Sequence, residues 1–347
     1  MNTVNTGKNI FKLNGTSKMK VIMLLLMMFS INIAFSQNYI DFQKNITRAE
    51  IAILDSNYTE ASNIYYDLFQ NYNFVFLGNC VSACQSAIAI NNDTLAFYFA
   101  ERAIKHGLKM NQIETEKTLK LLQTKAQWKA FSTNYDSLRV IYTKSVNWEL
   151  RKKINELYDR DQLWRDRHEL QWWNFLWKPL IKRRWYKELE QIVEIELVPL
   201  INQYGYPGEK LIGIDEKYMH HKSKNDSYNS YKIVIILIHY YSKNRSLDDT
   251  FLIDEIKKGN LQAKQFADFH DFKARTSGKN DYYCQWSWNL NFLIQVKENL
   301  TEEDVNKRRA EIGLGTHEQR MREQKNFINS RGKVYNNDPK PYVKIIY

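Results

Sequence analysis

Apolar residues recur every three or four positions along most of the chain, which is the spacing of one face of an α-helix. Residues 57–69 and 74–90 show this spacing clearly, and we expect a helix over each. Asn92 or Asp93 is placed to cap a third helix. A fourth helix is expected over residues 114–131. The first part of the chain therefore predicts a series of neighbouring helices.

Two of these helices are related by a repeat. Ala61 and Ala96 lie in equivalent places and are 35 residues apart, close to the period of about 34 residues in tetratricopeptide helix pairs. Residues 37–150 therefore loosely resemble tetratricopeptide-like repeats, although the Trp-x2-Leu-Gly pattern is missing and only about two repeats are visible. Each helix pair has an apolar face that only a neighbour can bury, so we expect stacked hairpins.

Helical spacing continues in the second half of the chain. We expect a long helix over 134–178, with a break near Trp172 and an end at Pro179. Ile233–Ile238 is a run of six aliphatic residues that fits a buried strand or a buried helix, and its helical surroundings favour the helix. Thr301 followed by acidic residues is typical of a helix N-terminus. Other helices are expected at 183–203, 249–257, 262–272 and 316–329, with a turn at 205–208 and a polar loop at 215–230.

The N-terminus has the features of a secretory signal peptide. Lys18 and Lys20 precede an apolar stretch at 21–34, and Ala34-Phe35-Ser36 supplies small residues at −3 and −1 of a cleavage site before Gln37. A membrane anchor is the alternative, but about 14 apolar residues are too few to span a bilayer. We therefore expect an exported protein, periplasmic or associated with the cell envelope.

Four segments follow: a signal peptide at 1–36, a helical-repeat-like domain at 37–150, a second helical domain at 151–330 and a C-terminal tail at 331–347. The fold class is predicted to be all-α, with stacked helical hairpins followed by a second helical domain. Composition agrees, because 12 Gly and 5 Pro in 347 residues are too few for the many turns of a β-sandwich. A hydrophobic share of 44% also argues against disorder.

Net charge and expected location limit the classes of partner that the protein could bind. The net charge is +11, and removing the four lysines of residues 1–36, which contain no acid, leaves 11 − 4 = +7. Export argues against a nucleic-acid partner. A protein or another envelope component remains open as partner, and so does contact with a membrane surface. The sequence leaves the oligomeric state open.

The sequence contains no recognisable metal or cofactor motif. Cys80 and Cys84 lie one helical turn apart, which is a poor geometry for a disulfide, and with Cys284 we expect them to pack as small apolar residues. His220 and His221 are adjacent, so on a helix they would point about 100° apart. We expect neither a bound metal nor a cofactor.

Four short motifs resemble an uncharacterised bacterial domain family of unknown function. They are Asp-Gln-x-x-Arg at 161–165, Gly-aromatic-Pro at 205–207 with Leu-Ile-Gly at 211–213, a buried helix ending in His239, and Arg-Arg-x-x-Ile-Gly-Leu at 308–314. The order and approximate spacing agree over residues 158–327. Two positions depart: Ile238 stands where members often carry Gln, and Tyr-Cys-Gln-Trp at 283–286 replaces Tyr-Gly-Thr-Gln. The family has no known activity, so the resemblance implies a fold and a candidate site only.

The polar residues of these motifs form the candidate site: Asp161, Gln162, Arg165, His239 and Arg309. Asp161 and Arg165 lie four positions apart and share a helix face beside apolar residues. A buried charge must be paired, or it costs several kcal/mol. The cluster is therefore either a salt-bridge network that fixes the register of the helices, or a site in which His239 binds a ligand or moves a proton near neutral pH.

Tryptophan and basic residues alternate over residues 164–185, where Trp164, Trp172, Trp173, Trp177 and Trp185 are interleaved with arginines and lysines. One interpretation is aromatic residues that pack helices, with solvated cations between them. The other is a face for a sugar or a lipid headgroup layer.

Two functions remain. Stacked helices and the lack of a reaction motif favour a binding or interaction module. The alternative is an enzyme of undefined, for example hydrolytic, chemistry centred on the candidate site.

Overall fold

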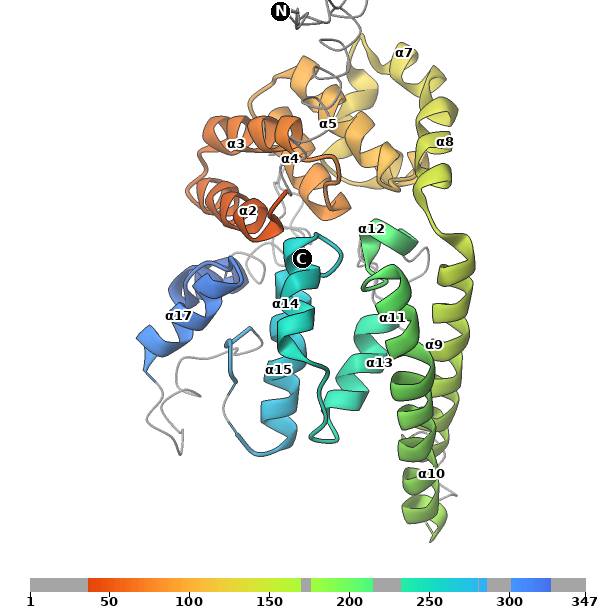
Figure 1. Ribbon diagram of the computed structural model, residues 1–347. Helices are drawn as coiled ribbons and strands as arrows, with labels where there is room; N and C mark the ends of the chain where they lie inside the picture. The colour runs from red at the N-terminus through yellow and green to blue at the C-terminus, as the bar shows by residue number, and fades with distance from the viewer. Residues whose placement is uncertain (1–36, 170–175, 215–231, 280, 286–300, 326–347) are drawn as a thin grey trace, which may run out of the picture. The chain divides into compact units, whose positions relative to one another are not determined.

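The computed structural model describes residues 37–169, 176–214, 232–279, 281–285 and 301–325. These residues form helices and no strand, which confirms the all-α prediction (Figure 1). In this part of the chain no helix is both long and apolar enough to cross a membrane. The predicted signal peptide, the loop at 215–230 with its two histidines, and the tail at 331–347 lie outside the described residues.

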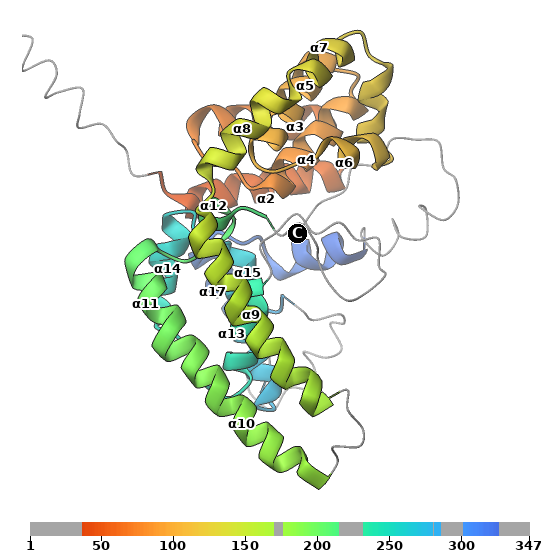
Figure 2. The ribbon, with the colours of Figure 1, turned by 90° about the vertical axis from the view of Figure 1, so that its right-hand side faces the viewer.

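The first helices stack in sequence order, each packed against the next (Figures 1 and 2). They are α2 (Tyr39–Leu54), α3 (Tyr58–Asn71), α4 (Leu77–Ala89) and α5 (Asp93–Lys105). Side chains of Asn38, Asn57 and Asn92 cap α2, α3 and α5 by accepting backbone N–H groups. Asn92, rather than Asp93, is thus the cap of the third predicted helix. The packing is that of stacked hairpins.

The fourth predicted helix is wrong. Residues 114–131 contain instead the end of α6 (Met110–Thr115), the 3-10 helix η1 (Leu119–Thr124) and the start of α7 (Trp128–Thr133). Glu116 is extended, and its carboxylate accepts the backbone N–H groups of Thr118 and Leu119 at 2.8 and 2.6 Å. This local hydrogen bonding competes with helix continuation.

The long helix predicted over 134–178 is divided. It consists of α8 (Tyr135–Ser145) and α9 (Trp148–Glu169), separated at Val146, and Asn147 begins the second helix by accepting the N–H of Leu150 at 3.0 Å. Pro179 does not end a helix. It lies in the first turn of α10 (Lys178–Glu190), where its missing N–H has no cost. The helix continues through the π-helical segment η3 (Gln191–Leu197) into α11 (Val198–Tyr204).

The remaining predicted helices are confirmed. They are α13 (Lys232–Tyr241), α14 (Asp249–Lys257), α15 (Ala263–Thr276) and α17 (Glu302–Glu311), with the short α12 (Glu209–Ile212) after the predicted turn and a last helical stretch at 317–325. The aliphatic run is therefore a helix. Thr301 caps α17 in a reciprocal capping box with Asp304.

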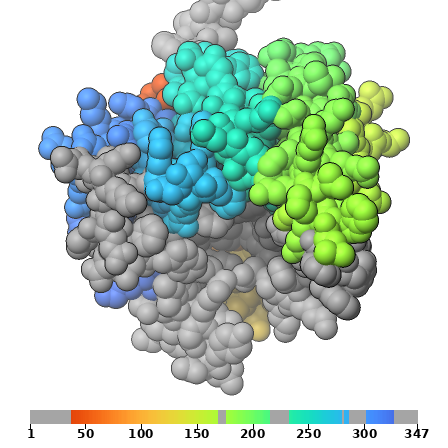
Figure 3. Space-filling view, turned by 90° about the horizontal axis from the view of Figure 1, so that it is seen from below, coloured from red at the N-terminus to blue at the C-terminus, as the bar shows by residue number. Residues whose placement is uncertain are grey.

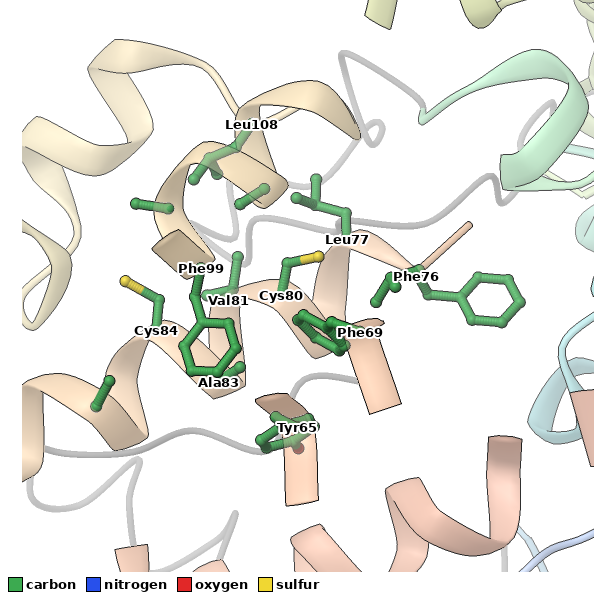
Figure 4. Close-up of a cluster of buried hydrophobic side chains, with 14 of the residues drawn as sticks. Tyr65, Phe69, Phe76, Leu77, Cys80, Val81, Ala83, Cys84, Phe99 and Leu108 are labelled. Carbon is green, nitrogen blue, oxygen red and sulfur yellow. The ribbon is translucent and has the colours of Figure 1, made fainter. Parts of the chain in front are cut away.

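Buried apolar side chains form two clusters. The first lies among α2 to α8. Figure 4 shows its centre, where Tyr65, Phe69 and Phe99 lie near the thiols of Cys80 and Cys84. The second lies among α9 to α15. Cys80, Cys84 and Cys284 are buried thiols. Residues 38–347 form one compact unit. The domain boundary near residue 150 stays a prediction.

A carboxylate on α12 connects the two clusters. Helix α4 lacks a cap of its own, because Phe76 precedes it, and the N–H of Leu77 donates instead to Oε1 of Glu209 at 2.5 Å. Burial raises the pKa of Glu209 to about 8. The preceding turn has little freedom, since a Cβ at Gly208 would lie 2.0 Å from the carbonyl oxygen of Asn260. This geometry explains why the turn carries glycine.

We expect Glu209→Ala to lower the free energy of unfolding by about 1–3 kcal/mol, because it leaves the buried N–H of Leu77 without an acceptor. Glu209→Gln keeps an acceptor oxygen. The folded pKa of about 8 exceeds the ordinary value of 4.5, so the folded protein holds an extra proton between these pH values and loses stability as the pH rises through them. Urea unfolding at several pH values should show that the free energy of unfolding falls less with rising pH in Glu209→Gln than in the wild type. Glu303→Gln, at an exposed position, is the control. Parallel pH curves for wild type and Glu209→Gln would contradict this.

Candidate functional site

Three helices meet around the carboxylate of Asp161. Asp161 lies on α9 and is completely buried. Its Oδ2 is 2.7 Å from Nδ1 of His239 on α13 and accepts the amide of Gln162 at 2.8 Å. Its Oδ1 accepts the indole N–H of Trp185 on α10 at 3.1 Å. The structure therefore brings together three of the predicted site residues and adds Trp185.

Local sequence patterns place these groups. Leu157 and Tyr158 are buried on the inner face of α9, and Asp161 follows them three to four positions later on the same face. His239 ends the apolar helix α13. Trp185 lies one turn before Leu189 on the buried side of α10. The carboxylate is therefore carried into the interior by its apolar neighbours.

The contact with Asp161 sets the orientation of His239. A carboxylate accepts hydrogen bonds, so Nδ1 of His239 carries the ring proton and its N–H donates a hydrogen bond to Asp161. The imidazole also meets the indole of Trp185 edge-on, with 5.4 Å between ring centroids. Within the described residues Nε2 has no hydrogen-bond partner, and the side chain keeps 14% of its surface exposed. Nε2 is thus the free end of an oriented ring.

Two lysines contact the aromatic rings of Trp185 and its neighbour Tyr186. The ammonium of Lys243 is 4.9 Å from the Trp185 ring centroid and 3.8 Å from that of Tyr186, and Lys182 is 5.6 Å from the latter. Burial alone would raise the pKa of Tyr186, but hydrogen bonds from Lys243 and Lys182 lower it. Neither lysine contacts a carboxylate in the described part of the chain. We call this group the Trp185 cluster: Asp161, Gln162, Arg165, Lys182, Trp185, Tyr186, His239 and Lys243.

Arg165 does not pair with Asp161. Its guanidinium contacts Asp166 at 3.3 Å, and its Nε is buried without a hydrogen-bond partner among the described residues. Oε1 of Gln162 is also buried without a hydrogen-bond partner among the described residues. The oxygens of Asp161 instead interact with Trp185, Gln162 and His239. The helix spacing predicted proximity correctly but not the pairing.

Arg309 belongs to a different group. From α17 it donates to the carbonyl oxygens of Gly315 and Tyr283 at 2.5 and 2.8 Å and to Oε1 of Gln285 at 3.3 Å. Burial lowers its pKa to about 10. Asp271 on α15 accepts the N–H of Tyr283 at 2.6 Å. Arg309 and Asp271 thus hold residues 281–285 in place, and Arg309 makes no contact with the Trp185 cluster in the described residues.

The sequence did not reveal Glu50, a second buried acid. Its Oε1 is 2.8 Å from the ammonium of Lys264. Burial raises the pKa of Glu50 to about 7, although the nearby Lys264 lowers it. Glu50 is 2% exposed because it shares the inner face of α2 with Ile46 and Ile53. An acid at an apolar position of a helix was the signal that could have identified it.

The tryptophans of residues 164–185 have no common environment. Trp185 is buried, whereas Trp177 is 61% exposed. Trp164 is half-buried beneath the guanidinium of Arg167, 4.9 Å from the ring centroid. Trp172 and Trp173 lie outside the described residues. Helix packing therefore explains some members of the segment and not others.

The Trp185 cluster can hydrogen-bond and transfer protons. An Asp–His pair stabilises an imidazolium, and its free nitrogen can accept or donate a proton. In the described residues no group of three or more His, Cys, Asp or Glu side chains could hold a metal ion. The cluster combines an oriented imidazole with two ammonium groups that contact the rings of Trp185 and Tyr186.

We expect Asp161→Ala to lower the free energy of unfolding by about 3 kcal/mol, because it leaves the donors of His239, Trp185 and Gln162 without their acceptor. Asp161→Asn should cost less, since one acceptor oxygen remains. Chemical denaturation measures both, and Asp159→Ala, on an exposed position of the same helix, is the control. A cost for Asp161→Ala no larger than that of the control would show that the carboxylate does not organise the site.

Comparisons with known proteins add no family. No family model matches the chain, and neither a curated protein nor a solved structure matches it significantly. The resemblances to a bacterial domain of unknown function and to tetratricopeptide-like repeats therefore stay predictions.

Proposed function

We propose that the chain is an exported helical binding module that holds an anionic group of its ligand at the Trp185 cluster. One observation carries the proposal: His239 is oriented by Asp161 with Nε2 free among the described residues, and its ring meets Trp185, which Lys243 also contacts. Neither Lys243 nor Lys182, which contacts the adjacent Tyr186, meets a carboxylate in the described residues. An anion would supply the missing countercharge. A phosphate or carboxylate suits donors of this kind, because ammonium and imidazolium groups make charge-assisted hydrogen bonds to it.

The electrostatics of the cluster support an anion over a cation. Asp161 is the buried negative charge, and its oxygens are used by three donors. A bound anion would favour the protonated imidazole of His239, and the buried carboxylate would stabilise that state from behind. Arg165, one helical turn after Asp161 on α9 and with its Nε unpartnered among the described residues, carries a further positive charge on that helix.

The stacked hairpins support a binding role in a second way. Helices α2 to α5 pack in sequence order, and arrays of this kind offer extended surfaces to partners. The proposal places the protein in the periplasm or at the cell envelope, because residues 1–36 have the features of a signal peptide. Its partner is then an envelope component rather than nucleic acid.

An enzyme remains the second candidate, favoured by the Asp161–His239 pair itself. A histidine oriented by a buried carboxylate is a general acid or base in many active sites. No hydroxyl or thiol side chain contacts Nε2 of His239 in the described residues. A reaction at this site would therefore use water or a substrate hydroxyl as nucleophile.

Titration with inorganic phosphate tests the binding proposal. We expect phosphate to raise the melting temperature and to shift the imidazole NMR signals of His239. Lys182→Met with Lys243→Met should weaken phosphate binding at least tenfold, since each removes a point charge from the cluster. Exposed Lys120→Met with Lys129→Met is the matched control.

His239→Ala separates the interpretations. Loss of phosphate binding at an unchanged melting temperature supports the site. Lost stability with unchanged binding would contradict the proposal and leave the cluster with a structural role. Absence of any phosphate response in the wild type would also contradict it.

A further inference from the structure

We infer that the start of α10 and the adjoining part of α9 form a docking surface for an anionic lipid bilayer. This surface is distinct from the Trp185 cluster, which uses the opposite side of α10. We call it the α10 tip and define it as Leu163 on α9 with Leu176, Trp177, Leu180, Arg183, Arg184 and Lys187 on and just before α10.

Large apolar side chains gather at this tip. Leu176, Trp177 and Leu180 are 72%, 61% and 52% exposed, and Leu163 on the neighbouring helix is 50% exposed. Helices α9 and α10 pack against one another, and Figure 2 shows them side by side. Figure 3 looks at the molecule from this end and shows α10 (yellow-green) at the surface that faces the viewer. Exposed apolar groups in one place indicate a contact with another apolar phase.

The apolar and basic residues share one side of the helix. Arg183, Arg184 and Lys187 follow Leu180 by three, four and seven positions, so they lie on its face, one and two turns farther along. All three are exposed. Trp185 and Leu189 face the interior from the other side. An apolar end followed by cations is the arrangement that places side chains in the acyl region and charges at the headgroups.

Charge selects the partner. Residues 178–187 contain five basic residues and no acid. The acids farther along α10 are neutralised by cations outside the helix, because Glu188 pairs with Arg160 on α9 and Glu190 with Arg245 after α13. Arg183, Arg184 and Lys187 have no acidic partner in the described residues. A surface with unpaired cations around leucine and tryptophan is complementary to anionic lipid, whereas a neutral bilayer would leave the cations without countercharge.

The geometry of the α10 tip fits contact with one leaflet of the bilayer and not a helix that crosses it. The exposed apolar residues occupy little more than the first turn of the helix, which corresponds to a shallow insertion below the headgroups. Trp177 is suited to this depth, because the indole ring prefers the interface between acyl chains and water. Binding should therefore be reversible and sensitive to salt.

Vesicle sedimentation tests the inference. The protein is expressed from its whole sequence and purified with the N-terminus that the cell leaves on it. We expect it to bind vesicles of phosphatidylglycerol and phosphatidylcholine in low salt, to bind pure phosphatidylcholine weakly, and to dissociate in high salt. Arg183→Gln with Arg184→Gln should weaken binding about 25-fold, since each cation near an anionic surface contributes about fivefold. Trp177→Ser with Leu180→Ser should weaken it at least tenfold.

Two matched controls keep the result specific. Val140→Ser with Ile141→Ser removes exposed apolar groups from α8, and Lys120→Gln with Lys129→Gln removes exposed cations from the first helical region. Both should bind vesicles as the wild type does. Every altered residue is exposed, so circular dichroism should be unchanged. Bromine-labelled lipid should quench tryptophan fluorescence less in Trp177→Phe than in the wild type.

Three results would overturn the inference. One is a wild-type protein that does not sediment with anionic vesicles in low salt. Another is equal binding by the tip variants and the controls. The third is self-association of the wild type without lipid that the tip variants abolish, because a second copy of the chain would then cover the tip. His239→Ala should leave vesicle binding unchanged, which separates this surface from the proposed ligand site.

Discussion

The buried carboxylate of Asp161 is the interaction on which the geometry of the site depends. Three helices contribute groups to it, and because it is completely buried, the loss of a donor is costly. Its bonds fix the tautomer of His239 and the position of the Trp185 ring. Because Lys243 and Tyr186 contact that ring, the carboxylate also determines where the positive charge of the cluster lies.

Buried acids also connect segments that are distant in the sequence. Glu209 caps α4, Asp271 holds residue 283, and Glu50 pairs with Lys264 on another helix. Burial raises the pKa of each, to about 8 for Glu209 and about 7 for Asp271 and Glu50. Carboxylates serve this purpose because they accept several backbone or ammonium donors at once. The same tertiary bonds make the connections sensitive to pH.

The presence of most helices was predictable from the sequence, whereas the residues at which they begin and end were less predictable. The apolar spacing identified α3, α4, α5 and α13, because periodicity reflects a face that must be buried. The errors came from single polar side chains. Glu116 and Asn147 bind nearby backbone groups and end or begin helices inside apolar patterns. Pro179 was misread because proline both ends helices and starts them.

The candidate site was predictable only in part, for a related reason. Spacing placed Asp161 and Gln162 on the inner face of α9, and the apolar run placed His239 at the end of a buried helix. Which donor takes which oxygen depends on the distance between helices, which a sequence pattern does not contain. Arg309 was grouped with Asp161 through motif order, but its guanidinium donates to the carbonyl oxygens of Tyr283 and Gly315 instead.

The π-helical segment η3 has a consequence for the alignment of the whole rod from α10 to α11. Buried residues recur there at strict intervals of four: Trp185, Leu189, Val193, Leu197 and Ile201. In a regular helix each such interval drifts by about 40°, so four of them would turn the last residue about 160° away from the first. The wider turns of η3 absorb part of that drift and keep both ends directed at the same core. Deleting one residue from η3 would rotate α10 about its axis relative to α11. The indole of Trp185 and the basic side of α10 would then face other directions.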